Sequence, residues 1–171
     1  MKKYIILLLV ITLSLTSFAQ EPEISEETST FYFIRHAEKN RSDKENKNPN
    51  LTQDGLFRAV KWSLVMKNMK FDAVYSTDYN RTKQTAQPTA EKNELELTIY
   101  DPINLDGKAF LEANKGKTVL IVGHSNTTPA FVNSVLGKEK YQDIDDNNNA
   151  NLYIITVTPS GDMSDVLLVV D

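Results

Sequence analysis

Short apolar runs alternate with longer amphipathic stretches along most of the chain. Residues 31–34 are all apolar or aromatic and predict a short, buried β-strand. Residues 52–67 predict a helix, because Thr52 is a good N-cap and apolar residues recur behind it. The apolar positions of this helix are Leu56, Ala59, Val60, Leu64 and Val65.

The same alternation continues to the end of the chain. Further strands are predicted over residues 71–75, 95–100, 118–122, 152–157 and 166–170. Further helices are predicted over residues 81–93, 106–114 and 127–136, with Pro88 as a local disturbance and Gly137 as a helix end. Two polar stretches, 40–50 and 143–149, are predicted loops. Alternating strands and helices predict an α/β fold, a three-layer α/β/α sandwich around a mostly parallel sheet.

The first 19 residues have the pattern of a secretory signal peptide. Lys2 and Lys3 form a basic start, residues 4–15 are almost continuously apolar, and small residues precede the predicted cleavage point after Ala19. The apolar run is shorter than the ~20 residues that a membrane span needs. We therefore expect cleavage rather than a retained membrane anchor, which is the alternative. The mature protein is then expected in the periplasm or outside the cell.

The remainder divides into a leader and one folded domain. Residues 20–30 are polar and predict a flexible leader, whereas residues 31–171 suit a single compact domain. The net charge of −4 argues against a nucleic-acid partner. The chain has no cysteine, which excludes disulfides and thiolate metal sites. We expect no membrane association after removal of the signal peptide, and the sequence does not reveal an oligomeric state.

Candidate chemistry gathers just past the ends of three predicted strands. Arg35 and His36 follow the first strand, Arg81 ends the segment after the second, and His124 follows the strand at residues 118–122. Parallel sheets bind ligands at the edge where the carboxyl ends of their strands lie. Both histidines of the chain fall at this edge with two arginines, which favours a shared site over coincidence.

These residue types suit a phosphate monoester. Arginine presents a planar fork of N–H donors that meets two phosphate oxygens. A histidine attacks phosphorus through an unprotonated ring nitrogen when its other nitrogen is held as a donor, commonly by a backbone carbonyl. A second, protonated histidine stabilises charge on the equatorial oxygens. None of this requires a metal or another cofactor, and two distant histidines without a fixed carboxylate partner are a poor zinc pattern.

Three segments with these residues also carry a family resemblance. Residues 31–39, 75–86 and 119–125 read FYFIRHAEK, YSTDYNRTKQTA and VLIVGHS. In this order they resemble the opening strand with its Arg-His-Gly signature, the second arginine segment and the second histidine segment of the histidine phosphatase superfamily, the phosphoglycerate mutase-like group. Residues 51–55 resemble the start of its first helix. The resemblance runs from about residue 31 to the end.

The resemblance implies a phosphohistidine intermediate at His36, with Arg35, Arg81 and His124 forming a phosphate pocket. The chain departs from the family at Ala37, where the signature has glycine. This small change is expected to leave the pocket intact.

Two polar residues follow the second histidine. The side chains of Ser125 and Asn126 could donate to the substrate or cap the helix that begins near Thr127, and the cap is favoured.

The proton donor for the leaving group is a separate question. A leaving alkoxide needs a proton, usually from a nearby carboxylic acid. The family often places this acid just after the strand that follows the second arginine helix, where this chain has Asp101. The alternative for Asp101 is a turn residue before Pro102. Asp106 is the next candidate, although it could equally cap a short helix, and Glu38 is expected to face solvent or to support the nucleophile.

Three functions fit these features, and one is preferred. The first is an exported, metal-independent phosphomonoesterase for a small phosphorylated metabolite or sugar phosphate. The chain lacks obvious room for a large lid, which argues against mutase chemistry because an intermediate must then be retained. The second is a phosphohistidine or phosphoprotein phosphatase. The third is a phosphate-binding module without turnover.

Overall fold

The computed structural model describes residues 27–171. The predicted signal peptide at residues 1–19 and most of the leader at residues 20–30 lie outside the described residues. Within residues 27–171, no helix is both long enough and apolar enough to cross a membrane.

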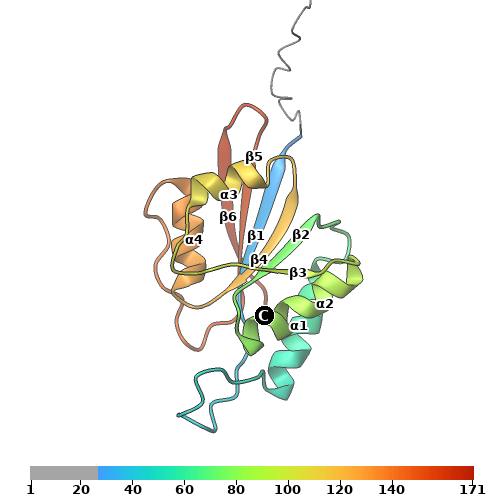
Figure 1. The fold of residues 1–171 in the computed structure, drawn as a ribbon, viewed down its shortest axis with the longest axis vertical. Coiled ribbons are helices and arrows are strands. Elements are labelled where there is room, and N and C mark those ends of the chain that lie inside the picture. Colours follow the sequence, from blue (N-terminus) through green and yellow to red (C-terminus); the bar gives the residue numbers. More distant parts are fainter. Residues whose placement is uncertain (1–26) are drawn as a thin grey trace, which may run out of the picture.

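The described residues form one six-stranded sheet in the middle of the fold (Figure 1). Its strands are β1 (Ser29–Arg35), β2 (Ala73–Ser76), β3 (Leu97–Ile99), β4 (Thr118–Gly123), β5 (Asn151–Val157) and β6 (Met163–Val169). Across the sheet the order is β3-β2-β4-β1-β5-β6. The first four of these pair in parallel, whereas β5 runs antiparallel to β1 and to β6. The sheet is therefore mixed but mostly parallel.

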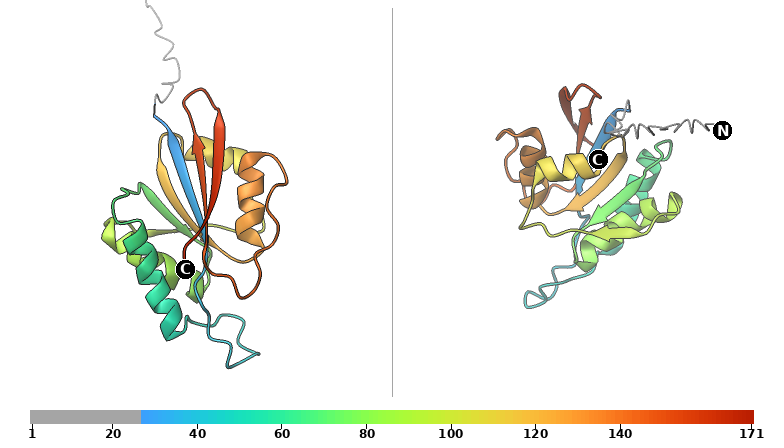
Figure 2. Two further views of the ribbon diagram at one scale, coloured as in Figure 1. Left: turned by 180° about the vertical axis from the view of Figure 1, so that it is seen from behind. Right: turned by 45° about the horizontal axis from the view of Figure 1, so that its top comes forward.

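Helices cover both faces of this sheet (Figure 2). They are α1 (Gln53–Val65), α2 (Asn80–Lys92), α3 (Gly107–Ala113) and α4 (Thr127–Leu136). The helices α3 and α4 pack on the face that carries Phe31 and Phe33, and α1 and α2 pack on the face that carries Ile34. The α/β fold expected from the alternating pattern is confirmed.

The strand that leads to the predicted nucleophile is buried on both faces. In β1, Phe31 and Phe33 belong to one core cluster and Ile34 to the other, and all three are fully inaccessible to solvent. A strand covered on both sides needs no polar face. This explains the continuous apolar run at residues 31–34 and gives the following residues a rigid base.

Two helix ends follow the predicted local signals. Thr52 caps α1, because its Oγ1 accepts a hydrogen bond from the Gly55 N–H at 3.1 Å. A Cβ at Gly55 would come within 2.3 Å of the Glu38 carbonyl oxygen, so glycine lets α1 pass directly over the segment after β1. At the other side of the fold, α4 ends at Gly137, whose φ of 65° is in the left-handed region.

The buried face of α1 differs from the prediction. Trp62 and Met66 are each 1% exposed and pack with Ala86 of α2 in one core cluster. Burial of an indole removes more apolar surface from water than burial of the smaller aliphatic side chains, so the helix turns its Trp62 face toward the core. Of the five predicted apolar positions only Ala59 is buried, and the exposed ones are Leu56, Val60, Leu64 and Val65.

Two smaller differences concern element lengths. The helix α2 continues through Pro88 to Lys92. The strand β3 covers only Leu97–Ile99, which is shorter than the predicted strand at residues 95–100.

Candidate active site

The sheet brings the ends of three parallel strands together. Arg35 at the end of β1 is paired with Gly123 at the end of β4, and Ser76 at the end of β2 is paired with Val122. The His36 N–H donates to the Gly123 carbonyl at 2.9 Å, which extends the pairing by one residue. The predicted nucleophile therefore leaves the sheet next to the second histidine segment.

These strand ends line a cavity of about 310 Å³. The rings of His36 and His124 meet edge to face, with their centroids 5.5 Å apart. All four residues of the predicted phosphate pocket line the cavity, and so do Ser125 and Asn126. The complete lining is Arg35, His36, Lys39, Tyr79, Arg81, Pro102, Ile103, His124, Ser125, Asn126, Thr127 and Asp146.

His36 has the geometry that a nucleophilic histidine needs. Its Nδ1 lies 2.7 Å from the Ala37 carbonyl oxygen. A carbonyl only accepts, so Nδ1 carries the proton and Nε2 of the neutral ring has a free lone pair. Burial lowers the pKa of His36 to about 3, and the charges of Arg35 and Arg81 act in the same direction. The ring is therefore neutral over the ordinary pH range.

His124 is held through both ring nitrogens. Its Nδ1 lies 3.3 Å from an Arg81 guanidinium nitrogen and its Nε2 lies 2.9 Å from Thr77 Oγ1. A guanidinium only donates, so Nδ1 accepts and the proton of the neutral ring lies on Nε2. The pKa of His124 is lowered to about 4, mainly by burial and then by the charges of Arg81, Lys39 and Arg35.

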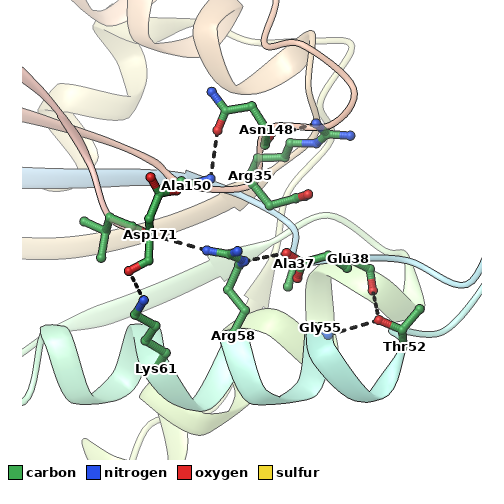
Figure 3. A network of polar contacts seen from close by, with 12 residues as sticks. Arg35, Ala37, Glu38, Thr52, Gly55, Arg58, Lys61, Asn148, Ala150 and Asp171 are labelled. Carbon is green, nitrogen blue, oxygen red and sulfur yellow. Dashed lines mark hydrogen bonds and ion pairs between the residues drawn. The ribbon is translucent and has the colours of Figure 1, made fainter.

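Arg35 is buried and fastened from one side by a distant loop. Its Nη1 donates to the carbonyls of Asp145 (2.8 Å) and Asn148 (2.9 Å), and its Nη2 donates to the Asp146 carboxylate (2.9 Å). Figure 3 shows the guanidinium of Arg35 beside Asn148. Within residues 27–171 its buried Nε has no hydrogen-bond partner. Arg35 is thus a positioned cation that keeps one donor unused.

Arg81 lies in the first turn of α2 and completes the cationic wall. Its guanidinium carbon lies 4.4 Å from the ring centroid of Tyr79, a cation–π contact that orients the side chain. In the described part of the chain its Nε is also buried without a partner. Arg35 and Arg81 therefore each retain a donor beside the cavity.

Three residues with contacts in the cavity were not anticipated from the sequence. Asp146 was part of a predicted loop and binds Arg35 across 111 positions, a pairing that no local signal announces. Tyr79 lies two residues before Arg81, in the segment already singled out. Lys39 was quoted within the first motif, and its position three residues after His36 was the available signal.

The structure does not bring Asp101 into the cavity. Its Oδ1 accepts from the Ile103 N–H at 2.9 Å and its Oδ2 from the Asn104 side chain at 2.7 Å. These bonds lower the pKa of Asp101, so the carboxyl is held in the ionised form that cannot donate a proton. Asp101 is a turn residue before Pro102, which was the alternative interpretation.

The two reserve candidates for the acid are also engaged elsewhere. Asp106 is the N-cap of α3, because its Oδ1 accepts from the Ala109 N–H at 3.0 Å. Glu38 pairs with Arg58 of α1 at 2.6 Å and lies away from the cavity lining (Figure 3). Among residues 27–171, Asp146 is the only carboxylate in the lining of the cavity.

The favoured capping role of Ser125 and Asn126 is not observed. Asn126 occupies the N-cap position of α4 with helical backbone angles, and its side chain makes no capping bond. The hydroxyl of Thr127 instead accepts from the His124 N–H at 3.2 Å. Both Ser125 and Asn126 line the cavity.

Comparison with known proteins agrees with this arrangement. Residues 31–104 match the family model of the histidine phosphatase superfamily, branch 1. The matched segment includes Arg35, His36 and Arg81, whereas His124 follows it and joins the site through β4.

Solved structures share the fold at low sequence identity. The protein histidine phosphatase SixA complexed with tungstate has a TM-score of 0.65 and 17% identity, with 82% of this chain and 96% of SixA covered. A phosphoglycerate mutase of Bacillus anthracis has a TM-score of 0.64 and 16% identity, over 86% and 95% of the two chains. A mycobacterial glucosyl-3-phosphoglycerate phosphatase has a TM-score of 0.64 and 12% identity, over 84% and 99%. No curated protein sequence matches the chain.

Proposed function

We propose that this chain is a member of the histidine phosphatase superfamily and a metal-independent phosphomonoesterase that forms a phosphohistidine at His36. Its substrate is a small phosphorylated metabolite or a sugar phosphate. The observation that carries the proposal is the 2.7 Å contact between His36 Nδ1 and the Ala37 carbonyl, which leaves a neutral Nε2 beside Arg35, Arg81 and His124. The signal-peptide pattern of residues 1–19 supports action outside the cytoplasm.

The reaction follows two displacements at phosphorus. The lone pair of His36 Nε2 forms an N–P bond while the P–O bond to the leaving group breaks, and the leaving oxygen keeps the electron pair and takes a proton from solvent. A water molecule then attacks phosphorus and loses a proton to solvent, the N–P bond returns its pair to Nε2, and phosphate leaves. Arg35 and Arg81 stabilise the charge that spreads over the equatorial oxygens.

His124 takes its protonated form when the substrate binds. In the free site Arg81 and Lys39 oppose a proton on His124. A phosphate dianion placed between these cations reverses the sign of the local field and raises the pKa of the ring. Protonated Nδ1 then donates to a phosphate oxygen in place of accepting from Arg81.

A second candidate, a phosphohistidine phosphatase, is favoured by one observation. The lining carboxylate, Asp146, is bound to Arg41 and Arg35, which lower its pKa to about 2, so it is a poor acid. A leaving imidazole needs less help from an enzyme acid than a leaving alkoxide does. The fold likeness to the protein histidine phosphatase SixA supports the same candidate.

One experiment tests the proposal with its alternatives. The purified chain is assayed with a chromogenic phosphate ester in the presence of a chelator, beside His36→Ala and beside Glu112→Ala, an exposed position on α3. We expect full activity in chelator, a loss of more than about 10³-fold in His36→Ala and none in Glu112→Ala.

Each contrary outcome points to another function. Activity that disappears in chelator contradicts the metal-free reaction, and activity that survives in His36→Ala contradicts the nucleophile. Phosphate binding without any turnover supports the non-catalytic binding module. Faster turnover of a phosphohistidine peptide than of any sugar phosphate selects the second candidate.

A further inference from the structure

Lys39 connects the phosphate pocket to a second hollow. It is the third residue after the nucleophile and lines the cavity described above. It also lines an adjoining hollow of about 160 Å³, whose walls include His36, Glu38, Arg41 and Asp146. Lys39 therefore borders both hollows.

The backbone holds Lys39 in place independently of the loop that follows. Lys39 forms an isolated antiparallel bridge with Leu51. On its two sides the Asn40 N–H donates to the Asn50 carbonyl and the Thr52 N–H donates to the Glu38 carbonyl, each at 2.8 Å. The base of the Lys39 side chain is therefore part of the rigid scaffold.

The ammonium of Lys39 has no ion pair or hydrogen bond within the described residues. The neighbouring carboxylates are already used: Glu38 pairs with Arg58 (2.6 Å), and Asp146 is shared by Arg35 (2.9 Å) and Arg41 (2.8 Å). Figure 3 shows Glu38 on the side of α1, near Thr52 and Arg58. Partial burial and then the charges of Arg41 and Arg81 lower the pKa of Lys39. Lys39 is a cation that lies near other cations and has no carboxylate partner, so it is suited to bind an anion.

The charges around the two hollows exceed those of one phosphate ester. With neutral histidines, the main cavity is lined by the cations Arg35, Lys39 and Arg81 and by the anion Asp146. A phosphate ester dianion balances this set. The second hollow adds Arg41 and Glu38, and because Glu38 is already paired with Arg58, the charge of Arg41 remains in excess. The whole chain has a net charge of −4, so this cationic site is a local feature.

We infer that Lys39 binds a second anionic group on the alcohol part of the substrate, a carboxylate or a second phosphate. The inference rests on the proposed function, because it describes the leaving group of the same reaction. Arg41 lies across the second hollow and adds positive charge there, while Arg35, Arg81 and His124 bind the phosphoryl group that is transferred. Lys39 is thereby a specificity residue that selects doubly anionic esters over singly anionic ones.

Matched pairs of ligands test this assignment by titration calorimetry. The full chain with His36→Ala is used in every arm, so that ligands are not consumed. One pair is 3-phosphoglycerate and glycerol 3-phosphate, which differ in a carboxylate. The other is fructose 1,6-bisphosphate and fructose 6-phosphate, which differ in a phosphate. We expect the doubly anionic ligand of at least one pair to bind about tenfold more tightly, as for one charge-assisted hydrogen bond.

Added substitutions assign that preference to Lys39. Lys39→Gln is expected to remove the preference and to leave the singly anionic ligands within about twofold, whereas Lys39→Arg retains it. Lys44→Gln, an exposed lysine on the same loop, is expected to change nothing. The pair that shows the preference identifies the second group as carboxylate or phosphate.

Two results overturn the inference. If Lys39→Gln weakens the binding of both members of each pair equally, Lys39 contacts the transferred phosphate. If neither pair shows tighter binding of its doubly anionic member, Lys39 binds no second anionic group. Because the titration requires no turnover, failure of the esterase assay contradicts the proposed function without deciding this result.

Discussion

Two polar loops flank the site, and they contact it in different ways. The loop at residues 143–149 surrounds the guanidinium of Arg35 with three backbone carbonyls, those of Asp145, Asp146 and Asn148, and with the Asp146 carboxylate. A buried arginine needs such partners, because an unpaired buried charge is costly. This loop therefore sets the position of a cation that the proposed reaction uses.

The loop at residues 40–50 contacts the site at its margin, where Arg41 pairs with Asp146 at 2.8 Å and the Lys47 carbonyl accepts from Arg81 at 3.5 Å. Asn40, Asp43 and Asn46 each accept a hydrogen bond from the N–H two residues further on, at 2.9 Å. These short turns need no tertiary contact. The difference teaches that similar polar composition serves two purposes: residues 143–149 enclose a buried arginine, whereas residues 40–50 combine local turns with a few contacts at the edge of the site.

The largest effect is expected from Asp146→Ala, which removes the carboxylate that binds Arg35 at 2.9 Å. Loss of one charge-assisted hydrogen bond corresponds to about 1.5–2 kcal/mol, or a ten- to thirtyfold fall in kcat/KM for a chromogenic ester. Asp145→Ala is the matched control, because only the backbone carbonyl of Asp145 contacts Arg35 and a fall below about threefold is expected. If steady-state kinetics give the same fall in kcat/KM for both variants, the loop acts through its overall conformation and not through the Asp146 carboxylate.

A smaller effect is expected on the pH dependence of stability, to which the two histidines and the Asp146 carboxylate contribute in different pH ranges. The pKa values of His36 and His124 are lowered to about 3 and about 4, whereas an unfolded histidine titrates near about 6.5. The unfolded state therefore binds more protons below about pH 6.5, and stability falls as pH drops toward about 4. The lowered pKa of Asp146, about 2, adds a further loss only below about pH 4.

Urea unfolding at pH 7, 6 and 5 measures this dependence. His124→Gln is expected to reduce the slope of the unfolding free energy by about 1.4 kcal/mol per pH unit near pH 5. Asp146→Asn is expected to leave the slope between pH 7 and 5 unchanged. A slope that stays the same in His124→Gln would mean that this ring is already protonated in the folded protein.

The smallest effect is expected from Asn46→Gly, which removes one of the local turns of residues 40–50. Its side chain accepts one exposed backbone bond, so the free energy of unfolding should change by less than about 0.5 kcal/mol. Catalysis of a small ester should change by less than about twofold in the same kinetic assay. A tenfold loss would show that this turn holds the loop contacts to Arg81 and Asp146 in place.

Local patterns in the sequence predicted much of this structure. The strand at residues 31–34, the cap at Thr52 and the helix that ends at Gly137 were predicted, because hydrogen bonds and backbone angles within a few residues decide them. The convergence of Arg35, His36, Arg81 and His124 was also predicted, since parallel strands end at one edge of a sheet. Their catalytic roles stay predictions.

Contacts between distant segments decided the rest. The buried face of α1 depended on Trp62 meeting Ala86 of α2, and the fastening of Arg35 depended on Asp146. The expected acid, Asp101, is the exception, because local N–H donors two and three residues away hold it in its own turn. The chain alone therefore determined which strand ends carry the candidate site residues, because spacing along a strand is local. Only the tertiary structure decided which charges are paired and which, like Lys39, remain available to a substrate, because pairing depends on what the fold brings within a few ångströms.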